Sequence, residues 1–189
     1  MYKFKKSETS IDGLFVIEPL VYGDNRGFFM ETYNKQAFRN LGIFISFVQD
    51  NHSKSTKGVL RGLHFQTRRP QEKMVRIIKG AVYDVAVDLR RESSTYGQYF
   101  GIKLSEENKK MVYIPKEFAH GFLALTEEVE IIYKVTDYYF PEYELGIIWN
   151  DPTINIHWPF EKYKLNRPIL SEKDKNLPTF LEIENQIAF

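Results

Sequence analysis

Short apolar runs separated by turn-forming residues make up most of the chain, a pattern typical of a β-sandwich or barrel. The run AVYDVAVDL, residues 81–89, alternates most clearly, because its even-numbered and odd-numbered residues fall on opposite faces of a strand. Gly80 supplies the tight turn before it. We predict strands at residues 14–19, 27–33, 46–53, 59–66, 72–79, 81–89, 98–104, 111–115, 120–126, 129–139 and 146–150.

Two segments have the pattern of a short helix. Asn34 can cap a helix over NKQAFRNLG that Gly42 ends, and Ser171 can cap a helical turn in SEKDKN. The C-terminal residues 177–189 are apolar enough to pack on the body or on a second subunit. With no repeat or linker, we expect residues 1–189 to form one domain, with a core of about 13–178 and a tail of 179–189. The architecture expected is a mostly antiparallel barrel or jelly roll with a few short helices.

Composition excludes several kinds of partner and chemistry. The 26 Lys and Arg nearly balance the 25 Asp and Glu, so a net charge of +1 gives no sign of nucleic-acid or membrane-surface binding. The absence of cysteine excludes disulfides, thiolate metal sites and a cysteine nucleophile. The N-terminus has no signal-peptide pattern, and no apolar run is long enough to cross a membrane. We therefore expect a soluble, cytoplasmic protein.

One stretch, GVLRGLHFQ, places a histidine inside a strand that otherwise reads as buried. Gly58 and His64 match the opening of the cupin motif G-x5-H-x-H, which continues with E-x6-G. In cupins these histidines and the glutamate bind a metal, because alternate residues of a strand point into the same barrel. Here Gln66 stands at the second ligand position, and Lys73, separated from Gly80 by six residues, stands at the glutamate position.

The second cupin motif, P-x-G-x2-H, reappears as PKEFAH. Pro115 and His120 are present, and Glu117 replaces the glycine. Two of four metal ligands therefore remain, and a third position carries the cation of Lys73. The sequence resembles a double-stranded β-helix, or cupin barrel, that binds no metal. On spacing alone, His64 and His120 could instead be ordinary core histidines.

Polar side chains recur in strands that should bury apolar ones. Because buried polar groups cost free energy unless they are paired or used, so many in one barrel indicate a wet cavity for a polar, anionic ligand. The set comprises Arg26, Glu31, Gln49, Asn51, His52, Arg61, His64, Lys73, His120, Tyr133 and Lys173.

Eight segments carry a resemblance to a known family. GDNRGFFMETYN, FVQDNHSKS, VLRGLHFQ, VYDVAVDLR, IPKEFAHGFLAL, YKVTDYY, WNDP and LSEKDK resemble the dTDP-4-dehydrorhamnose 3,5-epimerases, in order, from about Gly13 to Pro178. The resemblance implies conversion of dTDP-4-dehydro-6-deoxy-α-D-glucose to dTDP-4-dehydro-β-L-rhamnose. In this reaction the α-protons at carbons 3 and 5 would be removed and returned without metal or cofactor. The resemblance also implies a homodimer formed through sheet exchange at the N-terminal strands.

The resemblance also implies catalytic roles. His64 is the base, Asp174 orients it and stabilises its imidazolium, and Tyr133 protonates the opposite face of the sugar. Lys73 is expected to stabilise the enolate oxygen. Lys73 is also the candidate for a nearby cation that would help the Tyr133 hydroxyl to lose and regain its proton.

Ten further residues match substrate-binding positions of the family. Alternation turns the Asp50 side chain away from its neighbours, so that its backbone would bind, and position favours Tyr139 over Tyr138 as the residue that stacks on thymine. Arg26 and Glu31, in an early strand, would reach the site of the partner chain. The positions are Arg26, Glu31, Gln49, Asp50, Asn51, Arg61, His120, Tyr139, Glu144 and Lys173.

Other functions remain open at this point. A mono-epimerase acting only at carbon 3 or carbon 5 would share nearly all of these residues. A non-catalytic nucleotide-sugar-binding cupin is a second alternative, although it would not need His64, Asp174 and Tyr133 together. A metal-dependent cupin is a third, and Gln66 and Lys73 argue against it.

Overall fold

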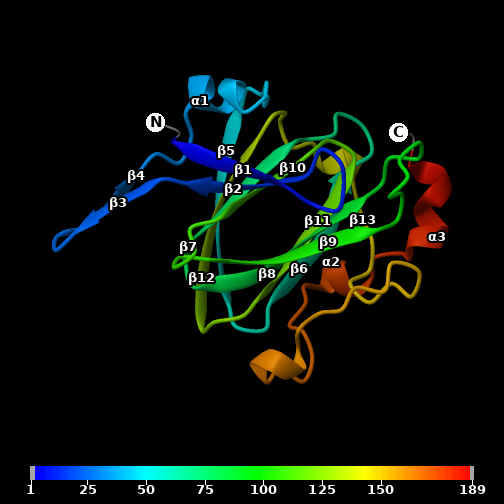
Figure 1. The fold of residues 1–189 in the computed structure, drawn as a ribbon. Coiled ribbons are helices and arrows are strands. Elements are labelled where there is room, and N and C mark those ends of the chain that lie inside the picture. The colour runs from blue at the N-terminus through cyan, green and yellow to red at the C-terminus, as the bar shows by residue number, and fades with distance from the viewer. Residues whose placement is uncertain (1–2, 188–189) are drawn as a thin grey trace.

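Two antiparallel sheets face each other in the computed structural model, which describes residues 3–187 (Figure 1). One sheet has the order β1 (Phe4–Glu8), β2 (Phe15–Pro19), β10 (Met111–Ile114), β7 (Lys73–Lys79), β12 (Glu128–Val135) and β5 (Gln49–Thr56). The other has the order β13 (Glu144–Gly146), β6 (Leu60–Gln66), β11 (Phe118–Ala124), β8 (Ala81–Asp88) and β9 (Tyr99–Ser105). Strands β5 to β8 alternate between the two sheets, the connectivity of a jelly-roll barrel. The mainly β, cupin-type fold predicted from the sequence is confirmed.

Both faces of β8 are buried, and its alternating residues are divided between two cores. Val82 and Ala86 belong to a core between the sheets, to which Val75 of β7 also contributes. Val85 and Val87 belong to a second core on the outer face of the five-stranded sheet. The chain therefore needs a cover for that outer face.

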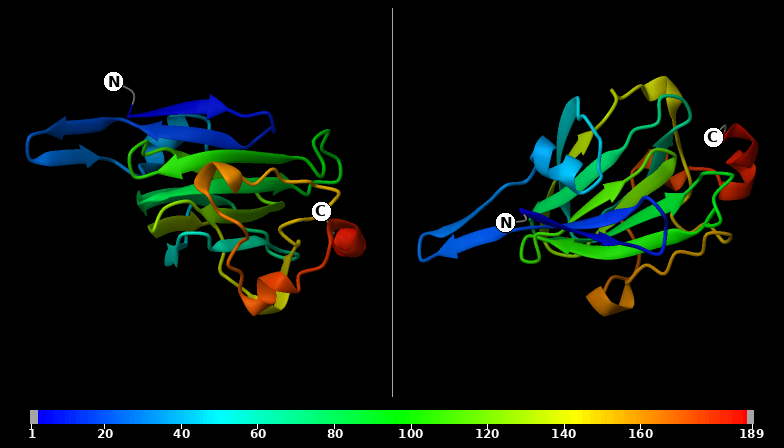
Figure 2. Two further views of the ribbon diagram at one scale, coloured as in Figure 1. Left: turned by 90° about the horizontal axis from the view of Figure 1, so that it is seen from below. Right: turned by 45° about the horizontal axis from the view of Figure 1, so that its top comes forward.

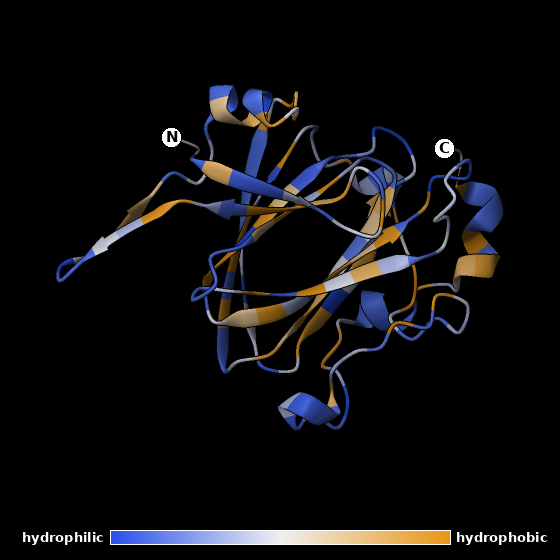
Figure 3. Ribbon diagram, in the orientation of Figure 1, coloured by the Kyte–Doolittle hydropathy of each residue, from blue (hydrophilic) through white to orange (hydrophobic). Residues whose placement is uncertain are grey.

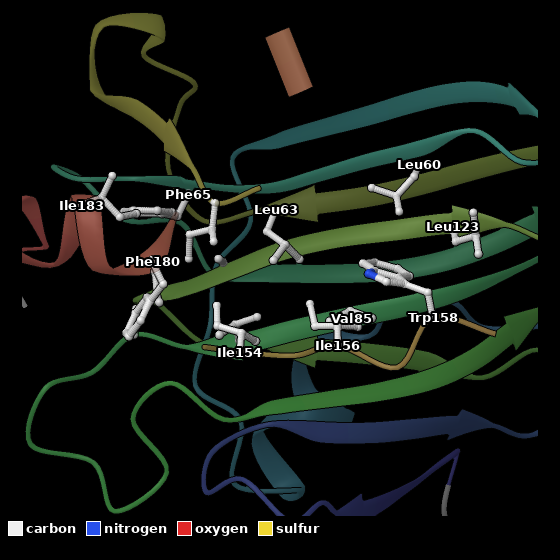
Figure 4. Packing of buried hydrophobic residues seen from close by; sticks show 14 of the residues in the cluster. Leu60, Leu63, Phe65, Val85, Leu123, Ile154, Ile156, Trp158, Phe180 and Ile183 are labelled. Atoms are coloured by element: carbon white, nitrogen blue, oxygen red, sulfur yellow. The ribbon is translucent and has the colours of Figure 1, made fainter. Parts of the chain in front are cut away.

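The C-terminal segment provides this cover. Figure 4 shows Ile154, Ile156 and Trp158 over the sheet, with Phe180 and Ile183 of α3 (Phe180–Ile183) beside them. Asp151 is buried, and its carboxylate accepts hydrogen bonds from the backbone N–H groups of Thr153, Ile154 and Phe180 at 2.7–2.9 Å. The apolar tail thus packs on the barrel of its own chain rather than on a second subunit. Residues 188–189 of the tail lie outside the described part.

The two predicted helices are confirmed. Helix α1 (Lys35–Asn40) begins after Asn34, whose side chain accepts from the Ala37 N–H at 3.0 Å. It buries Phe38 in a third apolar cluster, on the outer face of the six-stranded sheet. Helix α2 (Glu172–Lys175) begins after Ser171. Short 3₁₀ turns are η1 (Pro141–Tyr143), η2 (Glu161–Tyr163) and η3 (Glu184–Gln186). Within residues 3–187, no helix is both long and apolar enough to span a bilayer.

A two-stranded hairpin, β3 (Val21–Asp24) and β4 (Gly27–Met30), projects away from the barrel (Figures 1 and 2). Its side chains are largely apolar yet exposed, and Figure 3 shows hydrophobic colour along its strands. Tyr22 is 52% exposed, Phe28 59% and Phe29 66%. Large exposed apolar side chains gathered in one projection indicate an interaction surface.

Some predicted boundaries are wrong. The sequence gives little sign of β1, which is lysine-rich, or of β3, which has four residues. A strand predicted at residues 146–150 is instead the short β13, which ends at Gly146. A Cβ on Gly146 would lie 2.7 Å from the Leu63 carbonyl oxygen. Ile147, just after the end of β13, is buried and still exchanges backbone hydrogen bonds with Leu63 of β6, at 2.9 and 3.2 Å.

Candidate active site

A bulge in β6 directs His64 into the barrel. Gly62 has φ +101°, and a Cβ there would lie 2.5 Å from the His120 carbonyl oxygen. The register between β6 and β11 shifts at this point. Leu60 and Leu63, three positions apart, consequently share the outer core, while His64 faces the interior. The glycine in LRGLHFQ therefore sets the direction of the histidine.

His64 forms a hydrogen-bonded pair with Asp174. Ser171 caps α2 by accepting from the Asp174 N–H at 3.0 Å, which places Asp174 in the first turn. The His64 Nε2 atom lies 2.6 Å from Asp174 Oδ1. Burial opposes ionisation of Asp174, but the hydrogen bond from His64 helps to bring its pKa below the usual value. Because an ionised carboxylate only accepts, Nε2 carries a proton, and in the neutral ring Nδ1 keeps a free lone pair.

Lys73 and Tyr133 face the same interior from the six-stranded sheet. Burial lowers the pKa of Lys73 to about 8, while Asp84 and Glu144 act in the opposite direction. Burial raises the pKa of Tyr133, and Arg61 opposes this rise. Arg61 is thus a cation that acts on the Tyr133 hydroxyl. Lys73 lines both cavities together with Tyr133, and its expected help to that hydroxyl stays a prediction.

Two cavities meet at His64, Lys73 and Tyr133, which line both of them. The first encloses about 280 Å³ and the second about 480 Å³, sizes that suit the parts of a nucleotide sugar. Predicted residues on the first are Gln49, Asn51, Tyr139 and Glu144. Predicted residues on the second are Arg61, His120, Lys173 and Asp174.

Glu144 joins the two cavities through its contacts. Its Oε2 accepts a hydrogen bond from the Tyr139 hydroxyl at 2.7 Å and pairs with Lys173. Its Oε1 lies 3.8 Å from His64 Nδ1. Burial opposes ionisation, but the hydrogen bonds from Lys173 and Tyr139 help to lower the pKa of Glu144. The hydrogen bond to Glu144, together with burial, raises the pKa of Tyr139 to about 12. Tyr139 rather than Tyr138 lines the first cavity.

Three predicted residues lie away from both cavities in the described part of the chain. Arg26 sits at the tip of the hairpin, and Glu31 pairs with Lys3 near its base. Asp50 points to the outer face of the sheet and binds Lys134 at 2.8 Å, as alternation predicts. A role for Arg26 or Glu31 in the site would require a second copy of the chain.

Sequence reasoning missed Asp84 as a site residue. Its Oδ2 lies 3.0 Å from His120 Nε2, and its carboxylate is almost completely buried. The signal was present, because alternation places this acid among apolar residues on a buried face of β8. His120 is therefore held by a hydrogen bond to the buried carboxylate of Asp84.

Two motif departures also have structural explanations. The Gln66 amide donates to the Arg69 carbonyl at 2.8 Å and accepts from the Phe140 N–H at 2.7 Å, so it binds two loops together at the cavity edge. Glu117 replaces the motif glycine at φ +68°, and it lines the first cavity. Across residues 3–187, no group of three or more His, Cys, Asp or Glu side chains is placed to hold a metal ion.

The fold and the site together define a cupin-type protein equipped for acid–base chemistry on a small polar ligand. The family model for dTDP-4-dehydrorhamnose 3,5-epimerase matches residues 8–182, and the chain belongs to this family.

Individual relatives agree with this assignment. The dTDP-4-dehydrorhamnose 3,5-epimerase of Methanothermobacter thermautotrophicus is 53% identical over 93% of this chain and 94% of its own. A solved dTDP-6-deoxy-D-glucose-3,5-epimerase from Legionella pneumophila, in complex with dTDP-4-keto-L-rhamnose, is 46% identical. It has a TM-score of 0.92 and covers 97% of this chain and 96% of its own. A 3′-monoepimerase from Streptomyces bikiniensis, in complex with dTDP-quinovose, is 31% identical with a TM-score of 0.85. It covers 94% of this chain and 88% of its own.

Proposed function

We propose that this chain epimerises dTDP-4-dehydro-6-deoxy-α-D-glucose at carbons 3 and 5 to give dTDP-4-dehydro-β-L-rhamnose. The observation that carries the proposal is the His64–Asp174 pair on one wall of the cavity, with Tyr133 and Lys73 on the other wall. The family and its solved complex with a dTDP-sugar support the same substrate class.

The reaction needs a base, an acid on the other face and a stabiliser of the enolate, since both carbons flank a keto group. In our assignment the His64 Nδ1 lone pair removes the α-proton, and Asp174 stabilises the resulting imidazolium. The Lys73 ammonium stabilises the enolate oxygen. Tyr133, from the opposite sheet, delivers a proton to the opposite face and so inverts the carbon.

We assign the nucleotide to the first cavity and the sugar to the region where the cavities meet. Gln49 and Asn51 offer amide groups for the base edge, and Tyr139 offers a ring for stacking on thymine. Arg61 and Lys173, on the second cavity, supply positive charge for diphosphate or sugar oxygens.

A mono-epimerase is the second candidate, favoured by the likeness to the Streptomyces 3′-monoepimerase. Proton NMR of the substrate incubated with protein in deuterium oxide separates the candidates. Deuterium at both carbons, with the rhamnose configuration after coupled reduction, supports the double epimerase. Exchange at one carbon identifies a mono-epimerase. Exchange at neither carbon, with dTDP still bound, would leave a nucleotide-sugar-binding protein.

We also propose that two copies associate through the β3–β4 hairpin, with Arg26 reaching the cavity of the partner. The exposed rings of Phe28 and Phe29 would be covered in such a dimer. Replacing both with serine should give a monomer in light scattering, whereas Phe44→Ser, at a residue 79% exposed elsewhere, should not. A double variant that stays dimeric would contradict this interface.

A further inference from the structure

Two carboxylates flank the imidazole of His64, but their surroundings differ. Asp174, at Nε2, has a side chain only 5% exposed. Glu144, 3.8 Å from Nδ1, is paired on its other oxygen with Lys173, whose side chain is 53% exposed. Nδ1 thus faces a carboxylate that is linked to an exposed cation, whereas Nε2 faces a buried one.

The proposed function, on which this inference rests, creates a need for a proton path from the base to water. Each inversion moves a proton from carbon to His64 and another from Tyr133 to carbon. The site is then left with an imidazolium and a phenolate. A second inversion on the same sugar requires both groups to be reset while the sugar still covers the cavity. The base must therefore lose its proton by a route that the ligand does not block.

We propose that Glu144 relays this proton between the two inversions. His64 Nδ1–H gives its proton to Glu144 Oε1, and Glu144 gives it to water beside Lys173. Tyr133 regains a proton from water, so the protons balance over each step. The 3.8 Å separation is longer than a hydrogen bond, so the transfer uses a small ring movement or one bridging water. This role goes beyond the sugar contact expected for Glu144, because it acts through His64.

The test compares the two inversions in Glu144→Gln. The amide oxygen of glutamine can still accept from Tyr139 and Lys173, but the amide takes up no proton at neutral pH. With enzyme in excess over dTDP-4-dehydro-6-deoxy-glucose in deuterium oxide, NMR follows deuterium at each carbon. Because Glu144 also lines the cavity, both inversions are expected to slow. The second should slow by about tenfold or more relative to the first, so that singly epimerised sugar accumulates.

Added imidazole buffer provides the readout that a purely structural role would not move. A small proton acceptor should restore the second inversion in Glu144→Gln in proportion to its concentration, and it should not accelerate the wild type. Glu142→Gln, at an exposed glutamate two residues away, is the matched control. Glu144→Asp keeps a carboxylate and should need no added buffer, which tests the relay if the glutamine variant folds poorly.

The alternative outcomes are distinct. Equal slowing of both inversions in Glu144→Gln, without response to imidazole, would overturn the relay and leave Glu144 as a binding residue. Exchange at only one carbon, or at neither, in the wild type would instead defeat the proposed function, and the relay with it, because no second inversion would need the reset.

Discussion

His64 and His120 lie directly opposite each other in the register of β6 and β11, and each is hydrogen-bonded to its own carboxylate. The two pairs differ in setting. His64 lines both cavities and its side chain is 27% exposed, whereas His120 lines only the second cavity and is 11% exposed. The comparison supports the proposal that His64 is the base and that His120 is a neighbour at the proposed sugar end of the site.

The first prediction separates the two histidines. His64→Ala should abolish deuterium exchange, while dTDP affinity changes little, because the base contacts the sugar rather than the nucleotide. His120→Ala should slow exchange without abolishing it. Exchange is measured by NMR and affinity by calorimetry, with His157→Ala, at an exposed histidine, as control. A comparable loss of dTDP affinity in His64→Ala would show that the base is misplaced.

Asp174→Asn should preserve the shape of the site while changing the protonation of the ring. The new amide can donate to Nε2, which would move the imidazole proton to Nδ1 and remove the lone pair that acts as base. We expect the turnover rate to fall by roughly three to four orders of magnitude, as for comparable changes in other histidine–aspartate pairs. Steady-state kinetics with coupled reduction measures it. A fall of less than about tenfold would remove Asp174 from the mechanism.

Lys73 should give the activity an alkaline limit. Its pKa is lowered to about 8, so the side chain is a cation at neutral pH and loses its charge as the pH rises through that value. Turnover should decline over the same range. Lys73→Met should lower the rate at pH 7 by about a hundredfold or more through loss of enolate stabilisation. A pH–rate profile of both proteins decides it, and an unchanged rate in the variant would exclude Lys73.

The burial of Lys73 also predicts that Lys73→Met, which should lower the rate, raises the stability of the fold. The pKa of Lys73 lies below its ordinary value of 10.5, so the folded protein carries an unfavourable charge at neutral pH. Lys73→Met keeps the apolar stem, and we expect it to raise the melting temperature at pH 7 by about 4 °C. The advantage should shrink as the pH rises from about 8 towards 10.5, where the unfolded chain also loses the proton. An equal difference at pH 7 and pH 10 would contradict this account.

The C-terminal cover should contribute to global stability. Phe180→Ala removes a ring that is 4% exposed and packs on the five-stranded sheet, so we expect a loss of about 3–5 kcal/mol in the free energy of unfolding. The neighbouring Leu181 is 63% exposed, and Leu181→Ala should cost less than about 0.5 kcal/mol. Urea unfolding of both variants provides the comparison.

Motif spacing identified two of the four candidate catalytic residues, because the cupin strands fix which side chains share an interior. His64 and Lys73 stand at metal-ligand positions of that motif, so their convergence on one cavity could be predicted. The pairing of His64 with Asp174 joins residues 110 positions apart. Only the resemblance to the family pointed to that contact, since nothing local in SEKD indicates which strand the helix will face.

Other contacts could not be predicted because they depend on register and on backbone shape. The partner of His120 depends on which residue of β8 lies beside β11, so Asp84 was overlooked. Arg61, which opposes the rise in the pKa of Tyr133, comes directly before the bulge at Gly62. A bulge of one residue is not readable from alternation alone.

The proposed base belongs to one sheet of the barrel, whereas the proposed acid and the lysine belong to the other. The width of the gap in which a sugar ring would be held is therefore set by the apolar side chains that keep the sheets apart, among them Val75, Val82 and Ala86. A methyl group added or removed at these positions would alter the gap before it unfolded the protein. The spacing between the two sheets is thus one of the factors that set the reaction rate, so residues that do not contact the ligand can change that rate.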